Sequence, residues 1–268
     1  MNALHDLAVS REAVAIVQAM MNRVDSKLRL PVLLHSLVPM AVGAFEVLTA
    51  QLIDLIYHVR PGLLPKDEKD FSLSDLEQFD NLQDAIDDAI ERRVDSILAG
   101  SIEHWAKWFS RKGIEIDFSQ LALDWPDTLE IFQRRHIILH NEGRLSKRYL
   151  ARLAAYREDL PPLGAEVSTD ARYIQHALDN LNVLGSLLAV FVQKGLVGRL
   201  DKVTAHDLNA RVEGLMRLDC WQAAQKICTV SKRLKELPES ARITFQCGEW
   251  LCAKELNGIE TIRAAVGA

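Results

Sequence analysis

The segment Gln133 to Tyr149, QRRHIILHNEGRLSKRY, gathers residue types that could act on a phosphate group or hold a metal ion. His136 and His140 are four residues apart, so on a helix they share one face, and Arg135 stands beside them. An imidazole titrates near neutral pH and an arginine can contact an anion with two parallel hydrogen bonds. Three interpretations of this segment compete.

The first interpretation is a zinc site. H-x3-H on a helix supplies two ligands, but H-E-x-x-H hydrolases place a glutamate where Ile137 stands here. Glu142 is close in sequence, yet no third ligand is obvious. The second interpretation is a plain helix C-terminus, which collects basic side chains because they complement the carbonyl end of the helix dipole.

The third interpretation is cleavage of RNA without a metal or other cofactor. A histidine can take the proton of a ribose 2′-hydroxyl or give one to the leaving 5′-oxygen. An adjacent arginine can neutralise the charge that grows on the phosphate oxygens. Attack by the 2′-oxygen leaves a 2′,3′-cyclic phosphate, so DNA, which lacks that hydroxyl, would not be cut.

The composition indicates a soluble helical protein. The 268 residues are 49% hydrophobic and 26% charged, and 13 glycines with 8 prolines are few for an all-β chain. Charges interrupt the N-terminus where a signal peptide needs an apolar core. The longest uncharged stretch, Leu30 to Phe45, is shorter than the roughly 18 apolar residues of a membrane span. We therefore predict a cytoplasmic protein that does not contact a membrane.

The charge is unevenly distributed. The net charge is −5, but Lys66 to Asp95 carries eleven acidic and four basic residues, whereas Arg134 to Arg148 carries five basic residues and one glutamate. This balance excludes a globally basic nucleic-acid binder and leaves room for a local anion site. The four cysteines, all in the last fifth of the chain, lack zinc-ribbon spacing and are predicted to be reduced core residues: Cys220, Cys228, Cys247 and Cys252.

Apolar residues recur at helical spacing through most of the chain, which predicts an all-α fold. A stripe from Val14 to Leu28 predicts a first helix, and Ser74-x-x-Glu77 has the pattern of a capping box. Ser168 or Thr169 is expected to cap a later helix, and residues 113–123 form a connector. Helices are expected at 36–59, 82–99, around Trp105 and Trp108, and at 126–140, 170–194, 205–218, 221–237 and 239–256.

The opening segment resembles the HEPN superfamily, whose signature is an arginine, a polar residue, three further residues and a histidine. Here these are Arg135, His136, residues 137–139 and His140. EIFQRRHIILHNEGRLSKRYL is similar to the HEPN branch in which RRHxxxHN precedes a glycine and a tyrosine. The similarity extends to AVGAFEVLTAQLIDLIYHVRPGLL before it and to LGAEVSTDARYIQHALDNL after it, and so covers residues 1–198.

The resemblance implies an up-and-down helical bundle that is usually dimeric. Many HEPN proteins are metal-independent ribonucleases that serve as toxins or in antiviral defence, and two copies of the motif meet across the dimer. Other members are noncatalytic scaffolds or binding modules. We expect a HEPN-like domain at 1–198 and a C-terminal helical-hairpin extension at 199–268, which is weakly similar to tetratricopeptide repeats.

The preferred hypothesis is a homodimeric endoribonuclease that acts on RNA and needs no metal. In it His140 is the general acid and base, Arg135 stabilises the transition state, and His136 orients His140 or contacts the phosphate. Charge and proximity alone suggest further RNA contacts at Arg134, Asn141, Arg144, Lys147 and Arg148. The alternative is a noncatalytic interaction module, the partner-binding component of a defence or toxin–antitoxin system, with an antitoxin or another protein as its partner.

Overall fold

The computed structural model describes residues 26–65 and 76–258, with side chains from residue 32 onward. Within these ranges every secondary-structure element is a helix. One isolated antiparallel bridge joins Arg144 to Glu166. The all-α prediction is therefore confirmed. The predicted Val14 to Leu28 stripe and the Ser74 cap concern side chains outside the described part of the chain.

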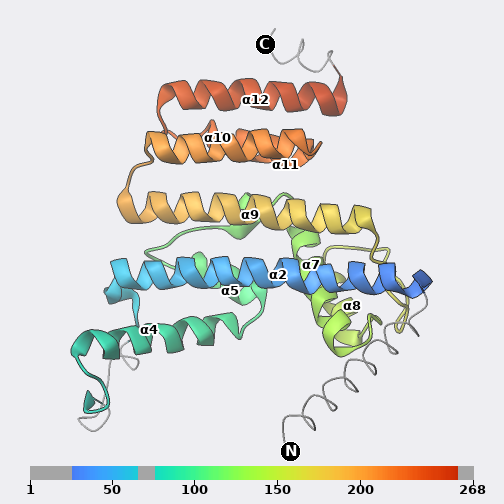
Figure 1. The fold of residues 1–268 in the computed structure, drawn as a ribbon, viewed down its shortest axis with the longest axis horizontal. Coiled ribbons are helices and arrows are strands. Elements are labelled where there is room, and N and C mark those ends of the chain that lie inside the picture. The colour runs from blue at the N-terminus through green and yellow to red at the C-terminus, as the bar shows by residue number, and fades with distance from the viewer. Residues whose placement is uncertain (1–25, 66–75, 259–268) are drawn as a thin grey trace, which may run out of the picture.

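The longer helices form a stack (Figure 1). Its centre is the pair α2 (Ser26–Val59) and α9 (Ala171–Val197), which pack along each other. On the α2 side follows α4 (Leu82–Leu98), and on the α9 side follow α10 (Lys202–Arg217), α11 (Trp221–Ser231) and α12 (Glu239–Asn257). A short 3-10 helix, Pro61–Leu63, directly follows α2.

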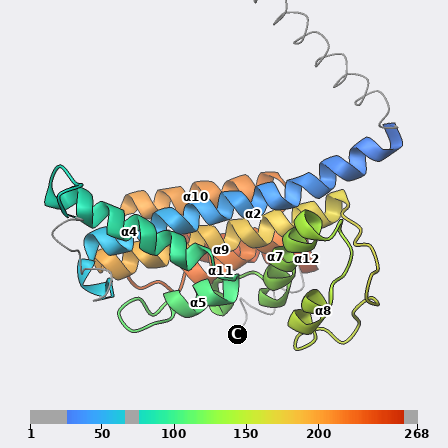
Figure 2. The same cartoon turned by 90° about the horizontal axis from the view of Figure 1, so that it is seen from below.

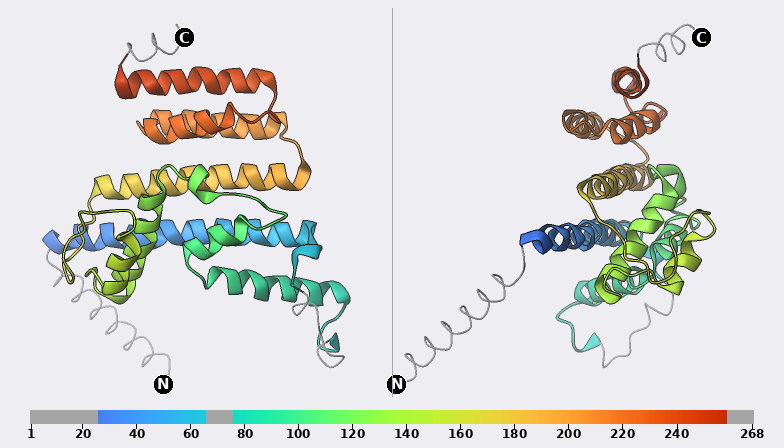
Figure 3. Two further views of the ribbon diagram at one scale, coloured as in Figure 1. Left: turned by 180° about the vertical axis from the view of Figure 1, so that it is seen from behind. Right: turned by 90° about the vertical axis from the view of Figure 1, so that its right-hand side faces the viewer.

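A second group of helices covers one face of the α2–α9 pair (Figures 2 and 3). In this group α7 (Trp125–His140) crosses both long helices and contacts both. The other members are α5 (Ile102–Phe109), α6 (Phe118–Leu121) and α8 (Lys147–Leu153). No described helix covers the opposite face of α2, as the end-on view in Figure 3 makes visible.

Five of these helices begin at a side chain that accepts a hydrogen bond from the backbone N–H three residues later. Such caps satisfy a donor that has no partner inside the helix. Asp170 caps α9, so the expectation of Ser168 or Thr169 was wrong by one or two residues. The five caps are Asn81, Asp124, Ser146, Asp170 and Asp201.

Aromatic side chains join α7 to the rest of the core. The Phe132 ring meets the rings of Phe45 on α2 and Trp105 on α5 edge to face, with centroids 6.0 Å and 5.5 Å away. Gly185 on α9 allows a close approach to α2, because a Cβ there would lie 2.8 Å from Leu48 Cδ2. The aromatic contacts of Phe132 fix the crossing of α7 over the central pair.

Two helix boundaries and two short helices differ from the sequence-based expectation. The backbone of α2 is helical from Ser26, ten residues before the expected start, although Pro39 interrupts its hydrogen bonding. Burial of Val38 and Val42 on either side of this proline outweighs that loss. α11 ends at Ser231 rather than at residue 237, and two short helices, α6 and α8, were not expected.

The C-terminal helices continue the core instead of standing apart from it. The predicted boundary coincides with Gly198, which ends α9 in the left-handed conformation (φ 74°). α11 packs against α9 as well as against α10 and α12, and one apolar cluster runs from α2 to α12. The division into two domains therefore stays a prediction.

The predicted core position is confirmed for three cysteines and wrong for the fourth. Cys220, Cys228 and Cys252 are buried, and burial raises the pKa of the Cys228 thiol to about 12. Cys247 is exposed on the outer side of α12. The difference follows from helix geometry, because the neighbouring Gly248 is the residue that packs against α11, where a Cβ would lie 2.9 Å from Cys228 Sγ.

Two described helices are long and apolar enough to cross a membrane by length and composition. They are Val32–Val59 in α2 and Ala171–Val197, and their most apolar windows are 22% and 50% buried inside the fold. The α2 window exceeds the uncharged stretch 30–45 because it continues past Glu46. Since the core helix of a globular protein meets the same criterion, the cytoplasmic location stays a prediction.

Phe132 provides a test of the aromatic contacts. Phe132→Leu should lower the free energy of unfolding by about 1–3 kcal/mol, because two edge-to-face pairs are lost and the ring volume is incompletely refilled. Urea unfolding followed by circular dichroism measures the change. Leu163→Ala, on an exposed loop, is the matched control and should change stability by less than about 0.5 kcal/mol. Equal effects of the two substitutions would contradict the role of Phe132.

Candidate active site at the end of α7

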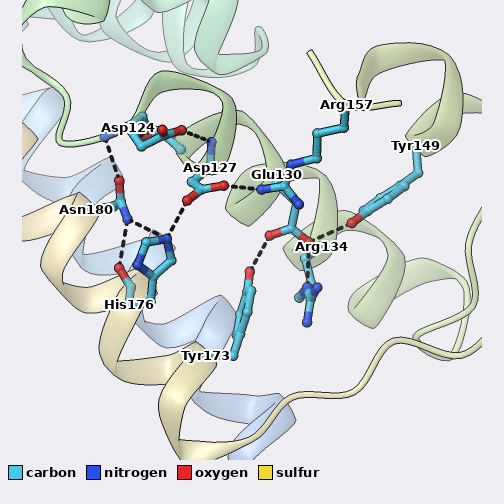
Figure 4. A network of polar contacts seen from close by, with 10 residues as sticks. Asp124, Asp127, Glu130, Arg134, Tyr149, Arg157, Tyr173, His176 and Asn180 are labelled. Carbon is cyan, nitrogen blue, oxygen red and sulfur yellow. Dashed lines mark hydrogen bonds and ion pairs between the residues drawn. The ribbon is translucent and has the colours of Figure 1, made fainter. Parts of the chain in front are cut away.

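A buried carboxylate holds α7 in place (Figure 4). Glu130, 2% exposed, accepts hydrogen bonds from Arg134 Nε at 2.7 Å, Tyr149 Oη at 2.6 Å and Tyr173 Oη at 2.8 Å. The two tyrosines come from α8 and α9, so one carboxylate ties three helices together. Burial and the charge of Glu130 raise the pKa of both tyrosines, which keeps them protonated as donors.

Arg134 belongs to this interior network. Its guanidinium lies 3.7 Å from the centroid of the Tyr173 ring and donates from Nη1 to the carbonyl of Ser168 at 2.6 Å. Burial disfavours its charge, but the neighbouring Glu130 outweighs burial and the pKa of Arg134 is raised. With its side chain 13% exposed, Arg134 is committed to internal partners, and the sequence-based expectation of a phosphate contact gains no support from its position.

A second polar network anchors the start of α7 to α9 (Figure 4). Asp127 accepts from His176 Nε2 at 2.6 Å through Oδ2 and forms an ion pair with Arg157 through Oδ1. The hydrogen bond from His176 lowers the pKa of Asp127 against the effect of burial, and the same bond raises the pKa of His176. Asn180 adds an acceptor for the backbone N–H of Asp124 at 3.1 Å. Sequence analysis missed this network, since nothing in the spacing pairs Asp127 with a histidine 49 residues later.

The motif formed by Arg135, His136 and His140 lies at the other end of α7. The His136 and His140 rings have their centroids 4.9 Å apart, tilted by 51°. His136 is half-buried and His140 is exposed, so both imidazoles lie at the surface. The structure therefore brings two of the three predicted catalytic side chains into contact distance on one helix face.

Arg135 points to α2. Its Nη2 lies 3.4 Å from Glu46 Oε2, a single long ion pair, and its buried Nε has no hydrogen-bond partner among the described residues. The side chain is 34% exposed. Its Nη groups have only the long contact to Glu46 among the described residues and so keep donors for an incoming anion. Glu46, 89 residues earlier in the chain, was not recognised in the sequence as a partner of the motif.

The surroundings of His136 are positively charged. Burial is the largest influence that lowers its pKa, and the charges of Arg148, His140 and Arg135 lower it further. A neutral imidazole with a lowered pKa can accept a proton near neutral pH. Lys147 and Arg148 are exposed at the start of α8 and form no ion pair with the described residues, so they leave a basic surface beside the motif.

A left-handed turn follows the motif and uses two of the predicted RNA contacts. Glu142 and Gly143 have φ of 52° and 73°, and the Gly143 N–H returns to the Ile137 carbonyl at 3.0 Å. The Asn141 amide donates to the Arg144 carbonyl, so it serves the turn. The Arg144 guanidinium is exposed and makes a 3.4 Å hydrogen bond to the carbonyl of Gly164. α7 thus ends where the sequence predicted.

Two kinds of functional side chain lie at the end of α7. In residues 26–65 and 76–258, no group of three or more His, Cys, Asp and Glu residues is arranged to hold a metal ion. What the end of α7 offers is two imidazoles for proton transfer and an incompletely paired guanidinium for anion binding. This combination suits acid–base chemistry on a phosphodiester.

Replacing Glu130 tests the interior network. Glu130→Gln should lower the free energy of unfolding by about 3–5 kcal/mol, because the buried Arg134 charge loses its counter-ion. Tyr149→Phe removes one donor and keeps the ion pair, so it should cost about 1.5–3 kcal/mol. Urea denaturation of both variants measures the difference. A Glu130→Gln protein as stable as the wild type would contradict the assigned role.

Comparison with known proteins adds no assignment to this geometry: no protein-family model, no curated protein and no solved structure matches the chain.

Proposed function

We propose that the protein is a HEPN-type, metal-independent endoribonuclease that acts as a homodimer in the cytoplasm, as a toxin or an antiviral defence effector. The observation that carries this proposal is the contact of His136 with His140 at the exposed end of α7, where the charge of Arg135 acts on His136. The basic surface at Lys147 and Arg148 supports the binding of a polyanion.

The proposed reaction follows from these groups. His140 takes the proton of the ribose 2′-hydroxyl as the 2′-oxygen forms its bond to phosphorus. The bond from phosphorus to the 5′-oxygen breaks, and an imidazolium, His140 of the second copy, returns a proton to that oxygen. Arg135 neutralises the charge on the phosphate, and His136 orients His140 or contacts the phosphate. The products are a 2′,3′-cyclic phosphate and a free 5′-hydroxyl.

The uncovered side of α2 supports the homodimer. Leu33, Met40 and Val47 are 56%, 66% and 59% exposed, and their spacing of seven residues keeps them on one side of the helix. Val47 directly follows Glu46, the ion-pair partner of Arg135, and lies about 100° from it around α2. An exposed apolar stripe of this kind is typical of a surface that binds another protein. Pairing of two such stripes is the contact that we propose for the homodimer.

Cleavage of RNA in EDTA is the direct test. The wild-type protein should cut single-stranded RNA without added metal and leave 2′,3′-cyclic phosphate ends. His140→Ala and Arg135→Ala should each lower the rate by about 10²–10⁴-fold, because each removes a group that acts in the transition state. Fragment ends and rates are read by gel electrophoresis and mass spectrometry.

Two matched controls accompany this assay. His206→Ala and Arg199→Ala remove an exposed histidine and an exposed arginine away from the motif and should leave the rate unchanged. Cleavage that persists in a folded His140→Ala protein, or that disappears in EDTA, would refute the proposal.

A substitution in the α2 stripe tests whether this stripe forms the dimer interface. Val47→Glu should convert a dimer into a monomer and abolish cleavage, because a carboxylate in an apolar interface would be desolvated without a partner. Sedimentation velocity measures the mass, and circular dichroism checks the fold. Ile243→Glu, at a similarly exposed apolar residue of α12, is the control and should leave both properties unchanged. A fully active wild-type monomer would refute the shared site.

The alternative function, a noncatalytic interaction module, is favoured by a different surface. Ile243, Cys247 and Leu251 share the outer side of α12 at intervals of four residues, and all three are exposed. Such a face could bind an antitoxin or another protein partner. Harmless expression of folded wild-type protein without any RNA cleavage would favour this function over the nuclease.

A further inference from the structure

The two neighbouring arginines of α7 have carboxylate partners of different kinds. Glu130, 2% exposed, accepts three hydrogen bonds, from Arg134 Nε at 2.7 Å and from two tyrosines at 2.6 Å and 2.8 Å. Glu46 has a single contact, with Arg135 Nη2 at 3.4 Å, and its side chain is 28% exposed. It makes no other hydrogen bond or ion pair with a described residue. The interior pair with Arg134 is therefore structural, whereas the pair with Arg135 has a different role.

Stability does not explain the pair of Glu46 with Arg135. A long ion pair between partly exposed side chains contributes little to the free energy of unfolding, because water screens both charges. The Arg135 side chain is 34% exposed, and its Nε is buried without a partner among the described residues. The two Nη groups are therefore the donors of this guanidinium that an anion can reach.

The Glu46 carboxylate is attached to a fixed part of α2. The preceding residue, Phe45, is 4% exposed, and its ring meets Phe132 of α7 edge to face with centroids 6.0 Å apart. Nearer the start of α2, His35 packs on the turn after the motif, where a Cβ on Gly143 would lie 3.5 Å from His35 Cε1. His35 and Glu46 are eleven residues apart, which places them about 20° apart around the helix. One side of α2 thus contacts the end of α7 at two points, which fixes the backbone of Glu46 relative to the motif.

The contact with Glu46 leaves donors of Arg135 for a phosphate. Glu46 Oε2 is the partner of Nη2, and Nη1 has no partner among the described residues. A guanidinium can donate to one acceptor through one Nη group and to a second acceptor through the other. Glu46 can therefore hold Nη2 while Nη1 donates to a phosphate oxygen. Holding one Nη group limits the orientations of the other, which reduces the entropy that is lost in reaching the transition state.

We propose that Glu46 is a positioning residue of the ribonuclease site and orients the Arg135 guanidinium toward the phosphate of the RNA. This inference rests on the proposed function and adds a residue of α2 to the site. Glu46 has two opposite effects on the reaction. Its negative charge weakens the binding of the polyanion in the ground state, and the orientation that it gives Arg135 stabilises the transition state.

The test measures kcat and KM of the full chain for cleavage of single-stranded RNA in EDTA. Glu46→Gln keeps the shape of the side chain and removes its charge, so kcat should fall at least about threefold because the contact with Arg135 weakens. KM should fall as well, because the repulsion between Glu46 and the RNA is relieved. A Glu46→Gln protein with the kcat of the wild type would overturn the proposal.

Glu46→Asp separates orientation from charge. It keeps the charge and withdraws the carboxylate by one methylene group, which breaks a contact that is already 3.4 Å long. We expect kcat to fall as it does in Glu46→Gln, with KM unchanged. If Glu46 acted through its charge alone, Glu46→Asp would behave as the wild type, and that result would overturn the positioning role.

A double-mutant cycle tests whether Glu46 acts through Arg135. Arg135→Lys keeps the positive charge and removes the two Nη groups, so in this background Glu46→Gln should cause no further loss of kcat. An equal loss of kcat in both backgrounds would overturn the proposal, because Glu46 would then act independently of Arg135.

Glu142→Gln is the control for charge. Glu142 is an exposed glutamate two residues after His140 and has no ion-pair partner among the described residues. Its replacement should lower KM without changing kcat. The melting temperatures of Glu46→Gln and Glu46→Asp should stay within about 2 °C of the wild type, and sedimentation velocity should give the wild-type mass. A larger loss of stability, or a change of mass, would show a structural role of Glu46 and would overturn the positioning role.

The outcomes distinguish this inference from the proposed function. Cleavage by the wild type together with an unchanged kcat of the Glu46 variants would overturn the role of Glu46 and leave the ribonuclease in place. Absence of cleavage by the folded wild-type protein would overturn the ribonuclease and, with it, the role of Glu46.

Discussion

The arrangement of this protein depends on one buried carboxylate. Glu130 accepts hydrogen bonds from a residue of its own helix and from tyrosines on α8 and α9, and it compensates the buried charge of Arg134. Without it, two hydroxyl groups and a guanidinium would remain desolvated in the core, which is far more costly than the loss of an exposed ion pair. This interaction therefore fixes the rotation of α7 about its axis.

That rotation decides what the motif presents to solvent. Because Arg134 is drawn inward to Glu130, the next residue, Arg135, is turned by about 100° and reaches α2 instead. His136 and His140 then lie together on the surface beside Lys147 and Arg148. The chemistry proposed for the end of α7 is thus a consequence of an interaction two helical turns closer to its middle.

α2 packs into the core on one side and is exposed to solvent on the other. Its buried side, with Val42, Phe45 and Ile53, forms the core with α9 and α7. Glu46 marks the edge toward the motif, and the α2 stripe of Leu33, Met40 and Val47 faces outward. Apolar residues on both the inner and the outer side explain why α2 satisfies the length and composition of a membrane span.

The sequence by itself determined the helical class, most helix positions, and the end of α7, because apolar periodicity, caps and a left-handed turn are local properties. It also located Arg135, His136 and His140 by their spacing along one helix. It misjudged Arg134, the start of α2 and the end of α11, and it missed α8, Glu46 and the pair of Asp127 with His176. Tyr149 on α8, His176 and Glu46 reach their partners on α7 from 19, 49 and 89 residues away in the chain. Only the tertiary structure decided them, because the energy of a buried charge or a continued helix is set by what packs against it, and local spacing does not encode that.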